Sequence, residues 1–198
     1  LRSQGYEPQL FQPILKNGTT DDFKGISYIR HYVASVLNME GLSILYTDAD
    51  AIWLRNPLPD MLDLIRLDGR GGVIASRGVF PERALNKWGA TLCTGVLLYY
   101  GRLGASFWKD LNNIRNAVND GHDQNYLNML LETVGVEWDD GKTRLEFQNS
   151  TKADHGIIGN FGAHVTLLPH ASYPRICENL VHEDVKILHC IRDQVADR

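Results

Sequence analysis

Hydrophobic positions along the chain follow two spacings, one typical of helices and one typical of buried strands. Apolar residues at three- and four-residue intervals predict helices, over 21–38, 60–67, 106–118 and 123–134. Short continuous apolar runs predict strands, over 42–46, 71–75, 90–100, 136–138, 165–168 and 185–189. Because strands alternate with helices, we expect an α/β domain built on a layered sheet. The glycine-rich segment 154–162 interrupts this pattern, and we expect a loop there.

The strand predicted over 42–46 runs directly into two aspartates, Asp48 and Asp50, and a second apolar stretch, 51–54, follows at once. Aspartate is rare in strands, and a buried carboxylate is costly unless it is paired or bound to a metal. At the end of a strand, where the chain turns, both carboxylates can reach one hard cation such as Mg²⁺ or Mn²⁺. Ligands of open α/β sheets bind beyond the carboxyl ends of strands. The plainer alternative is a solvated turn with helix-capping aspartates.

Length and composition are those of an ordinary globular chain. The 198 residues suit a single domain, 1–198, and the contents of 43% hydrophobic and 22% charged residues are unremarkable. The net charge of -4 and the lack of a long basic block give no sign of a nucleic-acid partner. The apolar runs are too short to span a bilayer. Since the chain starts at Leu1 without a visible signal peptide, we expect a trimmed sequence whose membrane anchor, if any, lies upstream.

The three cysteines are too few for a disulfide framework. Cys177 and Cys190 flank a predicted turn and could pair in an oxidising compartment, although buried free thiols explain them equally well. Cys93 falls in an apolar strand, and we expect it in the core. Two glycosylation sequons, at Asn17 and Asn149, favour a secretory route without establishing it.

Five segments resemble those of a known family. The stretch "LYTDADAIWLRNPLP" (45–59) closely resembles the metal-binding core of the nucleotide-diphospho-sugar transferases of glycosyltransferase family 77. Four further segments resemble motifs of that family and occur in its order: "CTGVLLYY" (93–100), "HDQNYLN" (122–128), "VTLLPHASYPR" (165–175) and "VKILHC" (185–190). The resemblance covers most of the chain from about residue 23 onward.

The resemblance implies a GT-A fold, which is a Rossmann-like α/β sheet flanked by helices. It also implies a metal-dependent glycosyltransferase that retains anomeric configuration. The expected cofactors are Mn²⁺ or Mg²⁺ and a nucleotide-sugar donor, specifically a UDP-sugar, and the expected acceptor is a glycan or glycoprotein. Such an enzyme would work in the Golgi lumen or another secretory compartment.

The sequence departs from the family pattern in two places. Cys93 stands where the family usually has Asn before Thr-Gly. Family members also begin with a strand, helix and strand that form the uridine-binding edge of the sheet, whereas "LRSQGYEPQLF" (1–11) starts after most of that unit. We therefore expect a sheet that lacks its first strand–helix unit, or a nucleotide pocket that is built differently.

Three residues are predicted to hold the metal. Asp50 is the first choice for a direct ligand, and the resemblance implies that Asp48 binds the metal through water or holds the ribose. His189 follows an apolar run, and a neutral imidazole could be the third ligand. Without the resemblance, an ordinary hydrogen-bonded histidine at a strand end would be preferred. The metal would neutralise the diphosphate leaving group as a Lewis acid.

Three residues are candidates for contact with the donor. Arg30 lies eighteen residues before Asp48, where the family generally has a basic residue, and a guanidinium suits bidentate contact with phosphate. A solvated surface arginine is an equally good explanation. Asp123 and Gln124 begin a predicted helix, and the resemblance implies that they face the sugar. The simpler interpretation of Asp123 is a helix N-cap.

Thr94 and Gly95 would line the acceptor side, because glycine permits close approach of a ligand to the backbone. His155 and His164 are better explained as structural or loop residues.

Two other functions compete with a transferase. A sugar-phosphate nucleotidyltransferase also uses an α/β sheet and metal-binding aspartates, but it would carry a glycine-rich phosphate loop near its start, and none is visible. A degenerate transferase could serve as a non-catalytic glycan- or partner-binding module. The four intact candidate residues argue against degeneration: Asp48, Asp50, Asp123 and His189.

Overall fold

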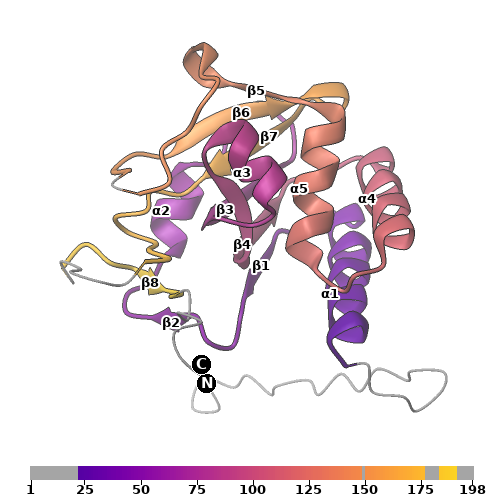
Figure 1. The fold of residues 1–198 in the computed structure, drawn as a ribbon, viewed down its shortest axis with the longest axis horizontal. Coiled ribbons are helices and arrows are strands. Elements are labelled where there is room, and N and C mark those ends of the chain that lie inside the picture. Colours follow the sequence, from indigo (N-terminus) through magenta and orange to yellow (C-terminus); the bar gives the residue numbers. More distant parts are fainter. Residues whose placement is uncertain (1–21, 149, 177–182, 191–198) are drawn as a thin grey trace.

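A mixed sheet of six strands runs through the centre of the computed structural model, which describes residues 22–148, 150–176 and 183–190 (Figure 1). The strand order is β1-β4-β3-β7-β6-β5. The strands are β1 (Ile44–Thr47), β3 (Gly72–Gly78), β4 (Thr91–Tyr100), β5 (Val136–Trp138), β6 (Asp154–Ile158) and β7 (Ala163–Leu167). Strands β3 and β7 are parallel, and the other neighbouring pairs are antiparallel. This arrangement agrees with the expected α/β class.

Pairing between β3 and β4 is interrupted in the middle of β4. Ala75 pairs with Leu97, but the next residue, Ser76, pairs with Cys93, so that residues 94–96 have no partner on β3. The end of β1 lies against this irregular segment, since Thr47 is opposite Val96. Irregular pairing of this kind bends a strand and redirects its side chains. It places residues 94–96 beside the two aspartates that follow β1.

Helices cover one face of the sheet and pack on its larger core. These helices are α1 (Asp22–Met39), α3 (Glu82–Trp88), α4 (Ala105–Val118) and α5 (Asp123–Val134). Their apolar residues pack with alternate strand residues, including Val73 on β3 and Leu97 on β4. Because successive side chains of a strand point to opposite faces, the neighbouring Ile74 and Leu98 belong to the second core. In Figure 1, α1, α4 and α5 lie side by side at the right of the sheet.

The second core lies on the opposite face. It joins Met61 of α2 (Leu58–Asp63), Tyr173 and Ile187 to the sheet. Ile187 belongs to β8 (Ile187–Leu188), which pairs with β2 (Ile52–Trp53) in a separate two-stranded sheet. The sheet is thus buried on both sides, which explains why its central strands were recognisable as continuous apolar runs.

The predicted loop over 154–162 is wrong. Residues 154–158 form strand β6, and a 3-10 turn, η3 (Gly159–Phe161), follows. Asp154 begins the strand in a buried position because it forms ion pairs with Arg77 and Lys142, at 2.6 Å each. Arg77 lies 77 residues before Asp154, so local composition indicated a polar loop where tertiary contacts support a strand.

Several element boundaries also differ from the prediction. Helix α3 and the short strand β2 were not predicted, although Pro81 and Gly89, at the two ends of α3, are typical boundary residues. The helix predicted over 60–67 is α2, which starts at Leu58 and ends at Asp63. Only two residues of the strand predicted over 185–189 are extended, those of β8. A further 3-10 turn, η2 (Asp139–Gly141), follows β5.

Cys93 is a buried free thiol, as expected, and Cys190 is disulfide-bonded. Its suggested partner Cys177 and both sequon asparagines, Asn17 and Asn149, lie outside the described residues. Within the described ranges, no helix has the length and apolar content needed to cross a bilayer.

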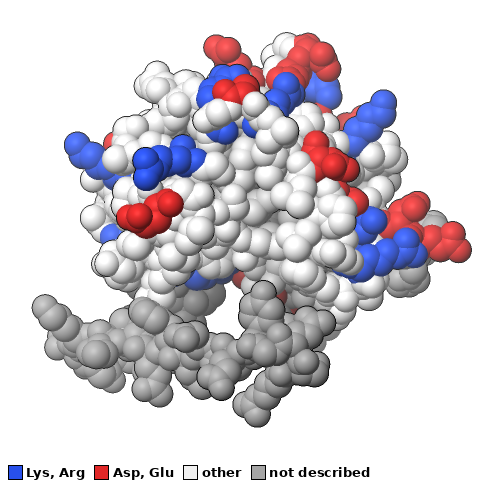
Figure 2. All heavy atoms as spheres, turned by 180° about the vertical axis from the view of Figure 1, so that it is seen from behind, with Lys and Arg blue, Asp and Glu red and all other residues white. Residues whose placement is uncertain are grey.

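Figure 2 shows that, seen from behind, the basic side chains lie mostly near the outline of the molecule, among acidic ones. On this face the described residues form no continuous basic stripe.

Candidate metal centre and active site

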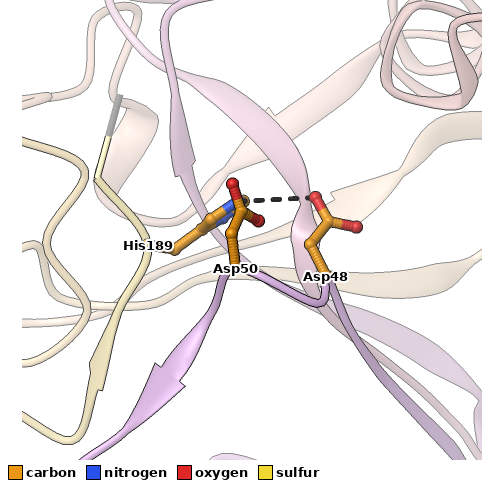
Figure 3. A group of neighbouring side chains, drawn as sticks. All are labelled: Asp48, Asp50 and His189. Atoms are coloured by element: carbon orange, nitrogen blue, oxygen red, sulfur yellow. Dashed lines mark ion pairs between the residues drawn. The ribbon is translucent and has the colours of Figure 1, made fainter. Parts of the chain in front are cut away.

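Asp48, Asp50 and His189 converge on one point at the end of β1 (Figure 3). One ligand atom from each residue can be chosen so that all three lie within 4.8 Å of one another. His189 Nε2 is 3.2 Å from Asp50 Oδ1 and 3.4 Å from Asp48 Oδ2. Adjacent ligands of an octahedral ion with bonds of about 2.1 Å lie roughly 3 Å apart. Two carboxylates and an imidazole at these separations therefore fit Mg²⁺ or Mn²⁺.

Backbone pairing explains why residues so distant in the sequence meet here. The N–H of Asp48 donates to the carbonyl of Gly95 at 2.8 Å, and the N–H of Ala51 donates to the carbonyl of Asp48 at 3.0 Å, so the chain turns at once after β1. Strand β2 then pairs with β8, with Ile52 opposite Leu188. His189 directly follows β8, and this pairing carries it to the aspartates that precede β2.

Gly95 provides the space that the imidazole of His189 occupies. A Cβ atom at Gly95 would lie 1.7 Å from His189 Cε1 and 2.8 Å from Asp48 Oδ2. No side chain other than hydrogen fits between β4 and this ring. We expected Gly95 to line the acceptor side, but the structure places it directly beneath two of the predicted metal ligands.

The surroundings of His189 favour a neutral imidazole. The side chain is buried, and burial and the Arg175 guanidinium lower its pKa by more than the nearby Asp48 and Asp50 carboxylates raise it. The backbone of His189 is held at both ends, because its N–H donates to the carbonyl of Pro174 (3.3 Å) and its carbonyl accepts from Arg175 (2.8 Å). On the other side of the ring, Nδ1 lies 3.9 Å from the sulfur of Cys93. Nε2 thus faces the carboxylates, and neutral imidazole is the form that binds metals.

Arg30 joins the metal cluster to Asp123. Its Nη1 lies 3.0 Å from Asp48 Oδ1 and 3.2 Å from Asp123 Oδ2, and its Nη2 donates to the carbonyl of Thr94 at 3.0 Å. The hydroxyl of Tyr46 donates to the carbonyl of Arg30 at 2.8 Å, which ties helix α1 to β1. The alternative that Arg30 is a freely solvated surface residue is therefore wrong.

Asp123 is not the N-cap of α5, because His122 occupies that position and Asp123 is the first helical residue. Its carboxylate is buried. Oδ1 accepts hydrogen bonds from the hydroxyl of Thr94 (3.0 Å) and the N–H of Gln124 (2.8 Å), while Oδ2 faces Arg30. The amide of Gln124 donates to the carbonyl of Phe80, in the loop before α3. Asp123 and Thr94 thus lie next to the metal cluster, joined to it through Arg30.

Two histidines that we expected to be structural lie in other networks. His155 Nδ1 lies 2.9 Å from the hydroxyl of Thr166, and His164 Nε2 lies 2.8 Å from Asp68. Two residues of the site received no role from the sequence, Arg175 and Cys93. Arg175 is the last residue of a segment that resembles the family, and this position could have marked it as a candidate site residue. Its contact with His189, however, depends on tertiary structure alone.

Comparison with known families identifies one match. The nucleotide-diphospho-sugar transferase family matches residues 11–189, which is most of the chain. Neither the curated proteins nor the solved structures contain a match to this chain. The mixed sheet flanked by helices is consistent with a GT-A-like fold, as the resemblance implied. The finer assignment to glycosyltransferase family 77 stays a prediction. The chain belongs to the nucleotide-diphospho-sugar transferases, a family of glycosyltransferases.

Proposed function

We propose that this glycosyltransferase is metal-dependent and retaining, and that it moves a sugar from a UDP-sugar to a glycan or glycoprotein. The proposal assigns Asp48, Asp50 and His189 as ligands of Mn²⁺ or Mg²⁺. The observation that supports it best is the fit of this cluster, with Gly95 leaving room for the imidazole at the end of a strand. We further propose that residues 1–198 act as a single domain.

The metal-binding residues would hold the donor at its diphosphate. A bound divalent ion supplies charge neutralisation for the diphosphate leaving group. Asp50 and His189 would hold the ion directly. Asp48 would share one oxygen with it and keep the other on Arg30, as its two separate contacts suggest. Arg30 would add a second positive charge near the phosphates, because a guanidinium contacts such oxygens in a bidentate manner.

Asp123 would act on the sugar side. Loss of the leaving group builds positive charge at the anomeric carbon, and a fixed carboxylate stabilises such charge. Thr94, Gln124 and Arg30 hold this carboxylate through its two oxygens, so it would keep its orientation during transfer. Thr94 would also border the acceptor, as the resemblance implies.

Asp50→Ala tests the metal assignment. We expect the substitution to abolish Mn²⁺-dependent binding of UDP, because the diphosphate charge is then poorly compensated. Calorimetric titration of UDP with and without Mn²⁺ measures it. The matched control is Asp63→Ala, since Asp63 is an exposed aspartate of α2. If wild-type protein binds UDP equally well with and without metal, the metal assignment is wrong.

The same titration, with an activity assay, separates the alternatives. Metal-dependent UDP binding without sugar transfer or donor hydrolysis would favour a non-catalytic binding module. Formation of UDP-sugar from a nucleoside triphosphate and a sugar phosphate would favour a nucleotidyltransferase.

We also propose that the enzyme works in the Golgi lumen or another secretory compartment. The disulfide at Cys190 supports this location, because disulfides persist in oxidising compartments. Expression in a secretory host, followed by intact mass measurement with and without glycosidase, is expected to reveal glycans at Asn17 or Asn149. A full-length protein found only in the cytosol would contradict the proposal.

A further inference from the structure

A cavity of about 240 Å³ lies between α1, the end of α4 and the start of α5. These helix ends lie close together at the lower right of Figure 1. The lining residues are Ser27, Tyr28, Arg115, Asn116, Asn119 and Tyr126. They combine two aromatic rings, two amides, a hydroxyl and a guanidinium, and no carboxylate is among them.

Two buried polar side chains of α1 have no hydrogen-bond partner within the described structure: Ser27, which lines the cavity, and His31, whose ring contacts that of the lining residue Tyr126. Ser27 is only 5% exposed, and its hydroxyl has no hydrogen-bond partner within the described structure. One turn further along α1, His31 is 4% exposed, and neither ring nitrogen has a partner there. Burial lowers the pKa of His31 to about 4, so the ring is neutral at physiological pH. Buried polar groups are rarely left unpaired, and each one calls for an explanation.

Among the described residues, the Arg115 guanidinium also lacks an acidic partner. The Arg115 guanidinium lies over the ring of Tyr28 at 4.3 Å and donates to the amide oxygen of Asn116 at 2.9 Å. No ion pair is formed by Arg115 with any carboxylate in the described ranges. The carboxylate of Asp120, on the loop between α4 and α5, accepts hydrogen bonds from the His122 N–H, the Asn125 amide and the Tyr126 side chain, which lines the cavity. Arg115 can therefore receive an anion from outside the chain.

Exposed aromatic rings extend from the cavity along α1. Tyr28 and Tyr32 are 46% and 55% exposed, and their rings stack in parallel with centroids 6.2 Å apart. Tyrosine is enriched at binding surfaces, so this stacked pair is a candidate contact for a ligand.

The cavity and the candidate active site are built in part on the same two helices, α1 and α5. Ser27 precedes Arg30 by three residues, and Tyr126 follows Asp123 by three residues. Each separation is close to one helical turn, or about 5 Å along the axis. The cavity-lining residues Ser27 and Tyr126 thus lie about one helical turn from the Arg30–Asp123 pair.

We propose that this cavity is an acceptor subsite for a sugar unit that carries a carboxylate or phosphate group. The inference rests on the proposed transferase function and adds a substrate class to it. The amides and the Ser27 hydroxyl would bond sugar hydroxyls, the tyrosine rings would pack against the sugar ring, and Arg115 would pair with the acid group.

Binding of free sugars tests the proposal without metal or nucleotide. D-Glucuronate, glucose 6-phosphate, inorganic phosphate and D-glucose are titrated in the presence of EDTA at matched ionic strength, with saturation-transfer NMR as the readout. We expect at least one of the two acidic sugars to bind about tenfold or more tightly than glucose, because a charge-assisted hydrogen bond is added. Equal binding of glucose would overturn the proposal. If inorganic phosphate binds as tightly as both acidic sugars, the cavity binds anions without recognising a sugar. That result would also overturn the proposal.

Two substitutions of lining residues test whether the acidic sugars bind in this cavity. Arg115→Gln should remove the preference for the acidic sugar, whereas Lys109→Gln, an exposed cation on the same helix, should not. Ser27→Ala should weaken sugar binding about threefold or more without lowering the melting temperature, because its hydroxyl has no partner to lose. Unchanged binding in both Ser27→Ala and Arg115→Gln would refute the subsite.

The result of the sugar-binding experiments can be distinguished from that of the metal and UDP experiments. If the metal assignment fails, Asp50→Ala leaves UDP binding unchanged, yet binding of the acidic sugar still responds to Arg115→Gln. If the subsite fails, Mn²⁺-dependent UDP binding persists, and the sugar titrations show no preference.

Discussion

Gly95→Ala is expected to weaken binding of Mn²⁺ strongly, although it adds only one methyl group. The new Cβ would lie 1.7 Å from His189 Cε1 and 2.2 Å from Nδ1, so the imidazole must leave its place. Removing a residue that only supports a metal ligand lowers metal affinity by about 10- to 100-fold. Losing one of the three proposed ligands itself should therefore weaken the affinity for Mn²⁺ by about 100-fold or more. Calorimetry or electron paramagnetic resonance of Mn²⁺ measures this directly.

The matched control is Gly104→Ala, because the nearest atom to a Cβ at that position is 3.6 Å away. It should bind Mn²⁺ as the wild-type protein does. Overpacking at Gly95 should also destabilise the fold by about 1–3 kcal/mol, so thermal melting must accompany the titration. A folded Gly95→Ala protein with unchanged affinity for Mn²⁺ would remove His189 from the proposed ligands.

Asp123→Asn is expected to lower turnover by about 10²-fold or more, the scale typical of losing one positioned electrostatic group. Asparagine keeps an oxygen that can accept from the Thr94 hydroxyl and the Gln124 N–H. It removes only the negative charge that would face the anomeric carbon. Sugar transfer or donor hydrolysis measures the effect, and the fall should appear in kcat rather than in KM alone.

Stability should change little in Asp123→Asn. Arg30 loses one ionic contact, but it keeps Asp48 at 3.0 Å and the carbonyl of Thr94. We expect a cost of about 1 kcal/mol or less, because Arg30 is itself partly exposed and water screens the charge that loses its partner. Asp110→Asn, on the neighbouring helix α4, serves as the control. Full activity in a normally folded Asp123→Asn protein would leave Asp123 with a structural role only.

The sequence predicted most of the long elements because their signals are local. Helix α5 runs from Asp123 to Val134 as the spacing of its apolar residues indicated, and β4 is the apolar run that ends at Tyr100. Strand β6 was missed for a physical reason. Its Asp154 is stabilised by Arg77, which lies 77 residues earlier, and its Gly156 lies close against β5, where a Cβ would meet the carbonyl of Glu137 at 2.8 Å. Neither contact leaves a local pattern in the sequence.

The candidate site divides in a similar way. The sequence by itself indicated a cation at Asp48 and Asp50, because two carboxylates directly after a buried strand need compensation. It also placed Asp123 at the first turn of a helix. His189 was proposed only through the resemblance to a family, since an isolated histidine after a short apolar run has a simpler structural explanation.

Only the tertiary structure decided how these residues work together. The pairing of β2 with β8 brings His189 to the aspartates, and the irregular pairing of β4 sets Gly95 under its ring. The structure alone also revealed that Arg30 bridges two carboxylates. These relations depend on strand register and on space between side chains. Both are properties of segments far apart in the chain, so no local sequence pattern can encode them.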